Sequence, residues 1–283
     1  MNKPRTTILT VTYNSAQVIE AMLDSLPPGT PTIIVDNGST DDTCARVAAR
    51  AGITLRKAGG NIGFGRGCNL AAQSAQTPYL LCLNPDARLT PGALESLQNA
   101  AGARPDLGAA NPRIEDAKGR ARPKMSSILP HPRLPRPNAD TPGEVPMLSG
   151  GALFLRRAAF DSVGGFDPNI FLYHEDHELC WRLREAGHTL WYLPQATVVH
   201  AAGTGTARSP QMALWKGHHM ARSRVYVMTK TGQRGAVWRT LLRAGLGALS
   251  PVNALSKRRR QKYLGQIIGA LSARKDGGVF RQE

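Results

Sequence analysis

Residues 6–41 read TTILTVTYNSAQVIEAMLDSLPPGTPTIIVDNGSTD. Residues 6–13 carry no charge and are rich in β-branched side chains, which is typical of a buried strand, and Thr32–Val35 repeats that pattern. Between them, residues 16–26 place apolar side chains at helical spacing, and two prolines and a glycine at 27–29 end the helix. A strand, a helix and a second strand in this order predict a βαβ unit with parallel strands.

The alternation continues toward the carboxyl end. We expect further strands at 53–57 and 79–83, with helices at 41–51, at 66–75 and from Pro91 onward. This order of elements predicts an α/β fold, a mostly parallel sheet flanked by helices on both faces. Sheets of this kind bind ligands in the crevice beyond the carboxyl ends of their strands.

The middle of the chain contains a segment without a regular period. Residues 115–146 are rich in proline, arginine and aspartate, and we interpret them as a mobile loop over the site. A helix is expected at Glu175–Ala186, followed by two short strands at Thr189–Leu193 and Ala196–Val199. We therefore expect the catalytic domain to span residues 1–210.

The last segment, residues 211–283, is helical in pattern and basic. Its apolar residues share one helical face, and the run KRRR occupies 257–260. We expect a basic amphipathic helical extension, in which two helices stand out. It can pack on the catalytic domain as a cap, or it can lie on an anionic membrane surface, and the sequence leaves both open.

Composition restricts the class of protein. Hydrophobic residues make up 41% and charged residues 20%, an ordinary globular balance, while the formal net charge of +16 indicates an anionic partner. The four cysteines form no CxxC pair, so we expect buried free thiols in a reducing compartment. The amino terminus has no apolar leader, and no run of about 18 apolar residues occurs. We expect a cytoplasmic protein.

Polar residues follow the predicted parallel strands. Asn14, Asp36 and Asp86 come directly after three of them, so they are expected at one edge of the sheet. A carboxylate such as Asp86, with substrate phosphates, suits Mg²⁺ or Mn²⁺, and Asp36 could accept from a base or ribose. The alternative is that both belong to ordinary turns, since Asn-Pro-Asp and Asp-Asn-Gly-Ser are common turn sequences.

The densest cluster of titratable groups is YHEDHELCWR, residues 173–182. Glu175 and Asp176 stand at a predicted helix start, where free N–H groups stabilise anions, so a carboxylate there is ionised and available as a base. Simple helix-start acidity is the alternative. His200 ends a strand, and a histidine in that position is either structural or a metal ligand.

Together these segments resemble the family-2 glycosyltransferases, especially their bacterial rhamnosyltransferase-like branch. The resemblance covers roughly residues 6–205, and its motifs come in the family's order and spacing. The motifs are TVTYNS at 10–15, VDNGSTD at 35–41, NIGFGRGCN at 61–69, LNPD at 83–86, SGGALFLRR at 149–157, GGFD at 164–167 with FLYHEDHELCWR at 171–182, and VVH at 198–200.

The resemblance implies a GT-A fold and an inverting transfer from a nucleoside-diphosphate sugar. Asp176 matches the family's catalytic base, with Glu175 beside it. Asp86 matches the second acid of the metal-binding DxD motif, Asn84 replaces the first, and His200 would complete the site for Mg²⁺ or Mn²⁺. The residues implied for the nucleotide sugar are Thr12, Tyr13, Asn14, Asp36, Asn61, Gly67, Asn69, Asn84, Gly150 and Gly151.

The implied donor is a dTDP-, UDP- or GDP-sugar, with rhamnose suggested by the branch. The implied acceptor is a glycan or a lipid-linked sugar in cell-surface polysaccharide or glycolipid synthesis, which would place the enzyme at the inner face of the cell membrane. A nucleotidyltransferase and a non-catalytic sugar-nucleotide binder are the alternatives. With 6% aromatic residues and no recognition motif, we expect no nucleic-acid partner.

Overall fold

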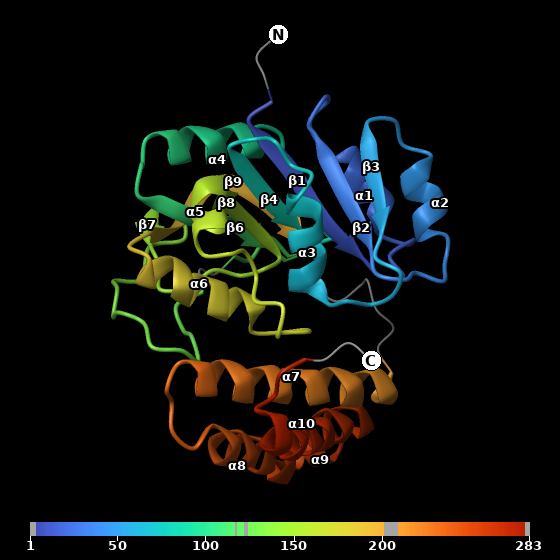
Figure 1. Ribbon diagram of the computed structural model, residues 1–283, viewed down its shortest axis with the longest axis vertical. Helices are drawn as coiled ribbons and strands as arrows, with labels where there is room; N and C mark the ends of the chain where they lie inside the picture. The colour runs from blue at the N-terminus through green and yellow to red at the C-terminus, as the bar shows by residue number, and fades with distance from the viewer. Residues whose placement is uncertain (1–3, 117, 122–123, 201–208, 281–283) are drawn as a thin grey trace.

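The computed structural model describes residues 4–116, 118–121, 124–200 and 209–280. An α/β domain lies above a layer of helices formed by the carboxyl-terminal segment (Figure 1). The sheet has the strand order β3-β2-β1-β4-β8-β6-β9-β5, and β7 pairs with β9. The strands are β1 (Thr6–Thr12), β2 (Thr32–Asp36), β3 (Ile53–Lys57), β4 (Tyr79–Leu83), β5 (Ala87–Leu89), β6 (Leu107–Glu115), β7 (Gly143–Glu144), β8 (Ala152–Arg156) and β9 (Thr189–His200).

Helices cover both faces of the sheet, as the sequence predicts. Successive strand residues point to opposite faces, so Ile8 packs in one apolar core and Leu9 in the other. Helices α1, α2 and α4 contribute to the core of Ile8, and α3, α5 and α6 to that of Leu9. The helices are α1 (Ile19–Asp24), α2 (Thr43–Ala48), α3 (Phe64–Ala72), α4 (Ala93–Gly102), α5 (Arg157–Ser162) and α6 (Glu175–Glu185).

The sheet is parallel in its first half and mixed in its second. β3, β2, β1 and β4 run parallel, so the ends of β1, β2 and β4 share one edge. β8 is antiparallel to both β4 and β6, whereas β6 and β9 are parallel. The antiparallel β8 brings the Gly150–Gly151 segment to the same edge, because it begins where β4 ends, with Ala152 opposite Leu83.

In this half of the sheet one sequence prediction was wrong, and one strand was not predicted. Residues 189–193 and 196–199 belong to one strand, β9, because its pairing with β6 resumes after a register shift between Pro112 and Arg113. The extra residues around Pro194 form an irregularity that breaks the period without ending the strand. The pattern also gave no indication of β5, which pairs with β9.

The segment 115–146 has little regular structure in its described part. It contains β7 and an isolated bridge between Glu115 and Ala121, and residues 117, 122 and 123 lie outside the description. Leu129 is nonetheless buried between the α/β domain and the helical layer, against Ile170 and Val227. The segment therefore runs past the site and packs against both layers.

The described part of the carboxyl-terminal segment, residues 211–280, contains four helices, whereas two helices stand out in its sequence pattern. They are α7 (Pro210–Lys230), α8 (Ala236–Leu249), α9 (Pro251–Ala254) and α10 (Lys257–Asp276). Helix α7 begins with Pro210 after Ser209, whose hydroxyl accepts from the Met212 amide. α7 and α10 pack backbone to backbone, since a Cβ on Gly265 or Gly269 would come within 2.2 Å of α7 carbonyl oxygens. Among the described residues, no helix combines the length and the apolar character needed to cross a bilayer.

Helix α7 is fixed to the α/β domain by a buried ion cluster. The Lys230 ammonium group lies 2.6 Å from both Asp167 Oδ2 and Glu178 Oε1. Glu178, in the first turn of α6, also forms a two-bond contact with Arg182, and the Tyr226 hydroxyl donates to Asp167. These contacts give Glu178 a structural role, and they show that part of the extension packs on the catalytic domain.

Candidate active site

Asp36 ends β2 and is buried within a network of hydrogen bonds. Its Oδ1 accepts from the hydroxyls of Thr12 (3.1 Å) and Ser39 (2.5 Å), and its Oδ2 from the amides of Gly38 (3.1 Å) and Ser39 (2.9 Å). Burial by itself raises the pKa of Asp36, but the bonds from Ser39 and its neighbours outweigh burial and lower it. All four lone-pair sites are thus engaged, so a nucleoside would have to compete for them.

The end of β1 lies beside this network. Asn14 has a left-handed backbone (φ 50°), and its side-chain oxygen accepts from the Thr40 amide at 2.8 Å, which ties the two strand ends together. Tyr13 is 41% exposed, although the seven residues of β1 before it are all buried. An aromatic ring exposed at the binding edge of a parallel sheet is suited to stack on a nucleobase.

Residues of the glycine-rich segment have two different surroundings. Some lie in the turn near the edge of the sheet, and others pack against the rest of the domain. The Asn61 side-chain oxygen accepts from the Gly63 amide at 3.1 Å and shapes the turn. A Cβ on Gly67 would come 2.7 Å from Val11 Cγ2, so Gly67 lets α3 approach β1. The Asn69 amide bonds both backbone groups of Phe166. Gly67 and Asn69 thus take part in packing and loop support, and their expected contacts with the nucleotide sugar stay a prediction.

Asp86 and His200 meet because β5 pairs with β9. The register sets Ala87 opposite His200, and His200 Nε2 lies 2.9 Å from Asp86 Oδ1. Two ligands at adjacent positions of an octahedral ion, each about 2.1 Å from it, stand roughly 3 Å apart. The 2.9 Å contact is a hydrogen bond in this structure, and its length also matches the spacing of two neighbouring ligands of one divalent ion, with a diphosphate to supply more oxygens. The described residues contain no group of three or more metal-binding side chains.

Gly150 and Gly151 lie between Asp176 and the candidate metal ligands. The Gly150 amide donates to Asp176 Oδ2 at 3.2 Å. A Cβ on Gly151 would stand 3.1 Å from the His200 ring and 3.8 Å from Asn84 Nδ2, and the Asn84 amide donates to the Gly151 carbonyl. Asp176, Asn84, Asp86 and His200 therefore surround one dipeptide, although they come from three distant parts of the chain.

Asp176 is held by three donors. Its Oδ2 accepts from the Lys124 ammonium group at 3.0 Å and from Gly150, and its Oδ1 accepts from the His177 amide at 2.9 Å. Burial alone raises the pKa of this carboxyl, but the charge and hydrogen bond of Lys124, together with His177 and His174, outweigh burial and lower it. Asp176 is consequently ionised at neutral pH, as a general base must be before it takes a proton.

Glu175 differs from Asp176 although the two are adjacent. Its side chain is buried, Oε2 has no hydrogen-bond partner, and burial together with the charge of Asp176 raises its pKa to about 8. The two preceding residues, Tyr173 and His174, both have left-handed backbones (φ 68° and 66°). Such conformations cost of order 1–3 kcal/mol each and cluster at functional sites. The strained turn sets the start of α6, where Asp176 can face Gly150.

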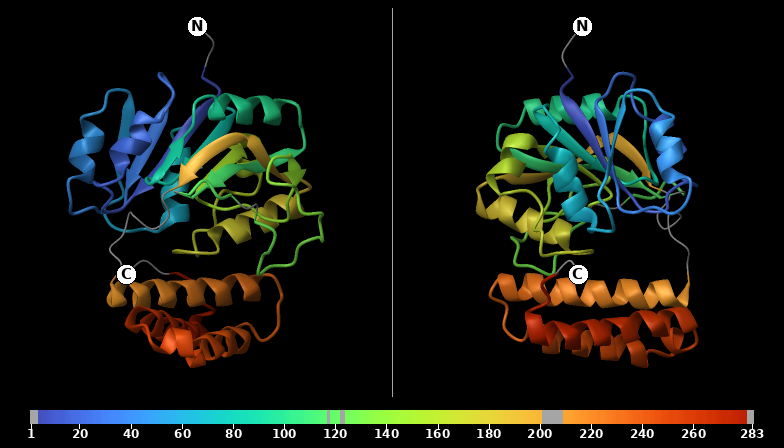
Figure 2. Two further views of the ribbon diagram at one scale, coloured as in Figure 1. Left: turned by 180° about the vertical axis from the view of Figure 1, so that it is seen from behind. Right: turned by 45° about the vertical axis from the view of Figure 1, so that its right-hand side comes forward.

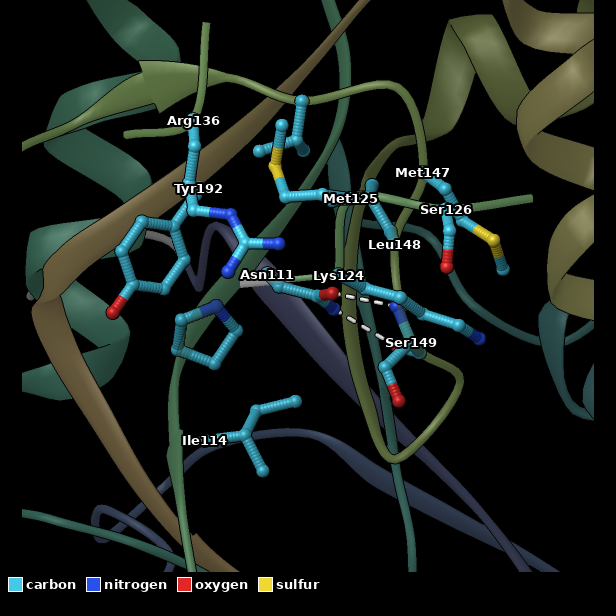
Figure 3. A pocket seen from close by; sticks show the side chains of 12 residues that line it. Asn111, Ile114, Lys124, Met125, Ser126, Arg136, Met147, Leu148, Ser149 and Tyr192 are labelled. Carbon is cyan, nitrogen blue, oxygen red and sulfur yellow. Dashed lines mark hydrogen bonds between the residues drawn. The ribbon is translucent and has the colours of Figure 1, made fainter. Parts of the chain in front are cut away.

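A cavity of about 510 Å³ is lined in part by the 124–149 segment, and one of its lining residues, Lys124, contacts Asp176. Figure 3 shows Lys124 and Arg136 among its lining side chains, together with Met125, Met147 and Tyr192. Asn111 forms part of the wall and fixes the segment before Gly150, because its amide donates to the Ser149 carbonyl and accepts from the Ser149 amide. The cavity thus combines two cations with an apolar surface, next to the candidate base.

Sequence reasoning missed Lys124. It lies in a proline-rich segment without periodicity, and only the folded chain brings it to Asp176, 52 residues away. Its one signal in the sequence was a basic side chain inside a loop expected over the site.

Comparison with known proteins decides the family. Residues 7–164 match the family described as Glycosyl transferase family 2. The chain belongs to glycosyltransferase family 2. An N-acetylglucosaminyl-diphospho-decaprenol L-rhamnosyltransferase of Mycobacterium tuberculosis H37Rv is 32% identical over 291 residues, covering 90% of this chain and 94% of that protein. Rhamnosyltransferase WbbL of Escherichia coli K12 is 28% identical over 51% of this chain and 62% of its own. This family-2 glycosyltransferase is thus rhamnosyltransferase-like.

Solved structures agree on the fold. GalNAc-T7, crystallised with UDP, GalNAc and Mn²⁺, aligns over 96% of this glycosyltransferase and 56% of its own chain, with a TM-score of 0.62 and 15% identity. A mannosyltransferase of Pyrobaculum calidifontis with GDP-Man and Mn²⁺ aligns over 96% and 87%, with a TM-score of 0.60 and 16% identity. The expected GT-A fold is confirmed, and the comparisons favour none of the alternative functions.

Proposed function

We propose that this glycosyltransferase moves L-rhamnose from dTDP-rhamnose, with inversion, to a hydroxyl of a sugar carried on a polyprenyl diphosphate. The observation that carries the proposal is the gathering of Asp176, Asp86 and His200 around Gly150–Gly151. The choice of sugar and acceptor is supported by the printed activity of the mycobacterial relative, which aligns with nearly the whole chain. The product would serve cell-surface polysaccharide synthesis.

The donor would lie across the edge formed by β1, β2 and β4. Tyr13 offers a ring for the base, and the hydrogen-bonded strand ends at Thr12, Asn14 and Asp36 would support the nucleoside beside it. Asn61 borders the ribose side, and Asn84 faces the sugar next to Gly150 and Gly151. This arrangement leaves the diphosphate at Asp86 and His200.

Asp86 and His200 would hold Mg²⁺ or Mn²⁺ in this arrangement. A bound divalent ion supplies positive charge that stabilises the leaving diphosphate. The carboxylate oxygen of Asp86 suits either ion, and the two solved relatives named above were crystallised with Mn²⁺. Because this chain offers one carboxylate here in place of two, the substrate phosphates would complete the coordination.

Asp176 would act as the base. It takes the proton of the acceptor hydroxyl as the hydroxyl oxygen attacks the anomeric carbon, opposite the bond to the diphosphate. That carbon–oxygen bond breaks, and nucleoside diphosphate leaves with the electron pair. A neutral Glu175 beside it preserves the ionised state of Asp176, because two adjacent carboxylates in a buried site do not ionise together.

The cavity beside Asp176 would receive the acceptor. Lys124 and Arg136 can pair with the acceptor diphosphate, and Met125, Met147 and Tyr192 offer apolar surface to its sugar and first isoprene units. This placement brings the acceptor hydroxyl to the side of Asp176 that faces away from the metal ligands.

The donor is tested by thermal shift with dTDP-rhamnose, UDP-glucose and GDP-mannose, each with and without Mn²⁺. A ligand that binds the folded state raises the melting temperature by mass action. We expect the largest, Mn²⁺-dependent rise with dTDP-rhamnose. Transfer of radiolabelled rhamnose to a short-chain N-acetylglucosaminyl-diphospho-prenol then tests the acceptor. A larger rise with a UDP- or GDP-sugar would reject the donor, and donor binding without product would reject the acceptor.

A further inference from the structure

Helices α8 and α9 and the residue after α9 expose a series of large apolar side chains. Six of them are between 63% and 90% exposed, and we call them the apolar face: Trp238, Leu242, Leu246, Leu249, Val252 and Leu255. On α8 they recur at intervals of four and three residues, so they share one side of the helix. Exposed apolar residues scattered singly are normal, but a contiguous stripe of this size indicates a binding surface.

The side chains of the apolar face do not belong to any of the apolar cores of the described residues. Helix α8 packs on the helical layer with its opposite side, where Ala236, Thr240 and Ala244 are buried. Helix α7 stands between the α/β domain and the other helices, so α8, α9 and α10 form the outermost layer (Figures 1 and 2). The apolar face therefore points away from the cores that hold the molecule together.

Positive charge surrounds the apolar face. No aspartate or glutamate occurs in the sequence between Glu185 and Asp276. On α8 the exposed Arg239 and Arg243 each follow an apolar-face residue, and α10 begins with the exposed run Lys257–Arg260. A helix with a broad apolar side and a basic border is suited to the interface of an anionic bilayer, where lipid phosphates meet acyl chains.

We propose that the apolar face inserts into the surface of an anionic phospholipid bilayer, with the surrounding arginine and lysine side chains on lipid phosphates. Helix α7 would then hold the catalytic domain on the membrane with the start of α6 on the side that faces the helical layer, as Figure 1 shows. The proposal deepens the proposed function by naming the surface on which a lipid-linked acceptor is met, yet its test needs no transfer reaction.

A second copy of the chain is the competing occupant. In a symmetric dimer the same patch meets itself, so Arg239, Arg243 and the 257–260 run would approach their own counterparts. Like charges brought together around an apolar contact oppose association, and no carboxylate side chain between Glu185 and Asp276 offsets them. An anionic bilayer provides the missing negative charge, which is why we favour it.

Flotation of the full chain with vesicles tests the proposal. We expect it to float with phosphatidylcholine vesicles that contain phosphatidylglycerol, and to float weakly with phosphatidylcholine alone. The variant Trp238→Ser/Leu242→Ser/Leu246→Ser should lose at least roughly tenfold in vesicle affinity, because the inserted area is gone. The matched control Trp238→Phe/Leu242→Met/Leu246→Met keeps apolar side chains and should bind like the wild type.

Charge is tested separately at the 257–260 run. Arg258→Glu/Arg259→Glu/Arg260→Glu should weaken binding to the anionic vesicles at least roughly tenfold, whereas the three Arg→Lys replacements should leave it nearly unchanged. All of these side chains are exposed, so circular dichroism and melting temperature should match the wild type in every variant.

Three results would overturn the proposal: a wild-type chain that stays unbound with anionic vesicles, a serine variant that floats equally well, or a serine variant that converts a soluble dimer into a monomer. Transfer to a water-soluble short-chain acceptor separates this proposal from the function. The serine variant should retain wild-type turnover there. If the serine variant stops floating but keeps its turnover, the apolar face is needed for membrane binding and not for transfer. If the wild type shows no turnover, the proposed function is wrong, and the membrane proposal is unaffected.

Discussion

The ammonium group of Lys124 lies 3.0 Å from Oδ2 of Asp176, and the two residues come from an irregular segment and from a helix start. The contact joins the cavity lining to the proposed base, because Lys124 also lines the cavity. It keeps Asp176 ionised, and it occupies one of the oxygens that would face an acceptor hydroxyl. An acceptor diphosphate that attracts Lys124 would release that oxygen, so acceptor binding and activation of the base are coupled through one side chain.

Replacement of Lys124 should change the pH dependence of transfer. Lys124 lowers the pKa of Asp176, so Lys124→Met should raise that pKa. A base acts only while ionised, so the acid limb of the kcat/KM profile should move to higher pH. Lys124→Arg keeps the charge and should leave the limb near its wild-type position. An acid limb that stays in place in Lys124→Met would show that another group controls it.

The metal pair should control donor affinity. Asp86→Asn removes the carboxylate and His200→Ala removes the imidazole that stands 2.9 Å from it. We expect each variant to lose most of the Mn²⁺-dependent part of donor binding, measured by calorimetry with and without Mn²⁺. Asp140→Asn, on an exposed side chain of the irregular segment, is the control. Equal Mn²⁺ dependence in Asp86→Asn and the wild type would remove Asp86 from the metal site.

Glu175 should make folding stability fall as pH rises. Its pKa in the folded chain is raised to about 8, so between its ordinary pKa near 4.5 and about 8 the folded state holds a proton that the unfolded state releases. The contribution of Glu175 to the free energy of unfolding is therefore complete below its ordinary pKa, and it decreases as the pH rises to about 8. Glu175→Gln removes the decline.

We expect Glu175→Gln to be more stable than the wild type at pH 8, by on the order of 1 kcal/mol or more, and the difference to shrink toward pH 5. Urea unfolding at the two pH values measures it. Glu185→Gln, on an exposed residue of the same helix, should show little difference at either pH. A Glu175→Gln difference that is the same at both pH values would contradict the raised pKa.

The ion cluster under α7 should matter for stability. Lys230→Met leaves Glu178 and Asp167 buried with fewer cationic partners, and we expect a loss of about 1–3 kcal/mol in the free energy of unfolding. Arg46→Met removes an exposed pair with Glu20 and should cost less than about 1 kcal/mol. Chemical denaturation compares the two variants. Equal losses would mean that the cluster does not fix α7 to the catalytic domain.

Local patterns were sufficient for the first half of the fold. Residues 79–83 form the strand that their apolar run predicts, because a buried strand carries a continuous apolar signal. Residues 53–57 also form the predicted strand, although β3 lies at the edge of the sheet and its side chains are exposed or only partly buried. Strand β6 has no such signal, since its sequence contains Gly108, Asn111 and Pro112. It becomes a strand because β8 and β9 pair with it on either side, and that information is not local.

The sequence predicted the acidic residues of the candidate site but not the contacts that these residues make. Asp86 and Asp176 carry a recognisable pattern, but the three-residue strand that brings Asp86 to His200 is too short to show a period. The glycine-rich segment indicates that a backbone approaches something closely. Only the structure shows that Gly67 approaches Val11 and that Asn69 holds Phe166. Lys124 depends on a contact across 52 residues, which no local pattern encodes.

Asp176→Asn distinguishes a catalytic base at position 176 from a residue that only binds or shapes the site. The variant keeps the size and shape of the side chain but cannot take the proton. We predict calorimetric affinity for dTDP-rhamnose and Mn²⁺ close to that of the wild type, with a turnover of rhamnose transfer lower by roughly 100- to 10,000-fold. Turnover near the wild-type rate, with the donor bound normally, would contradict the account.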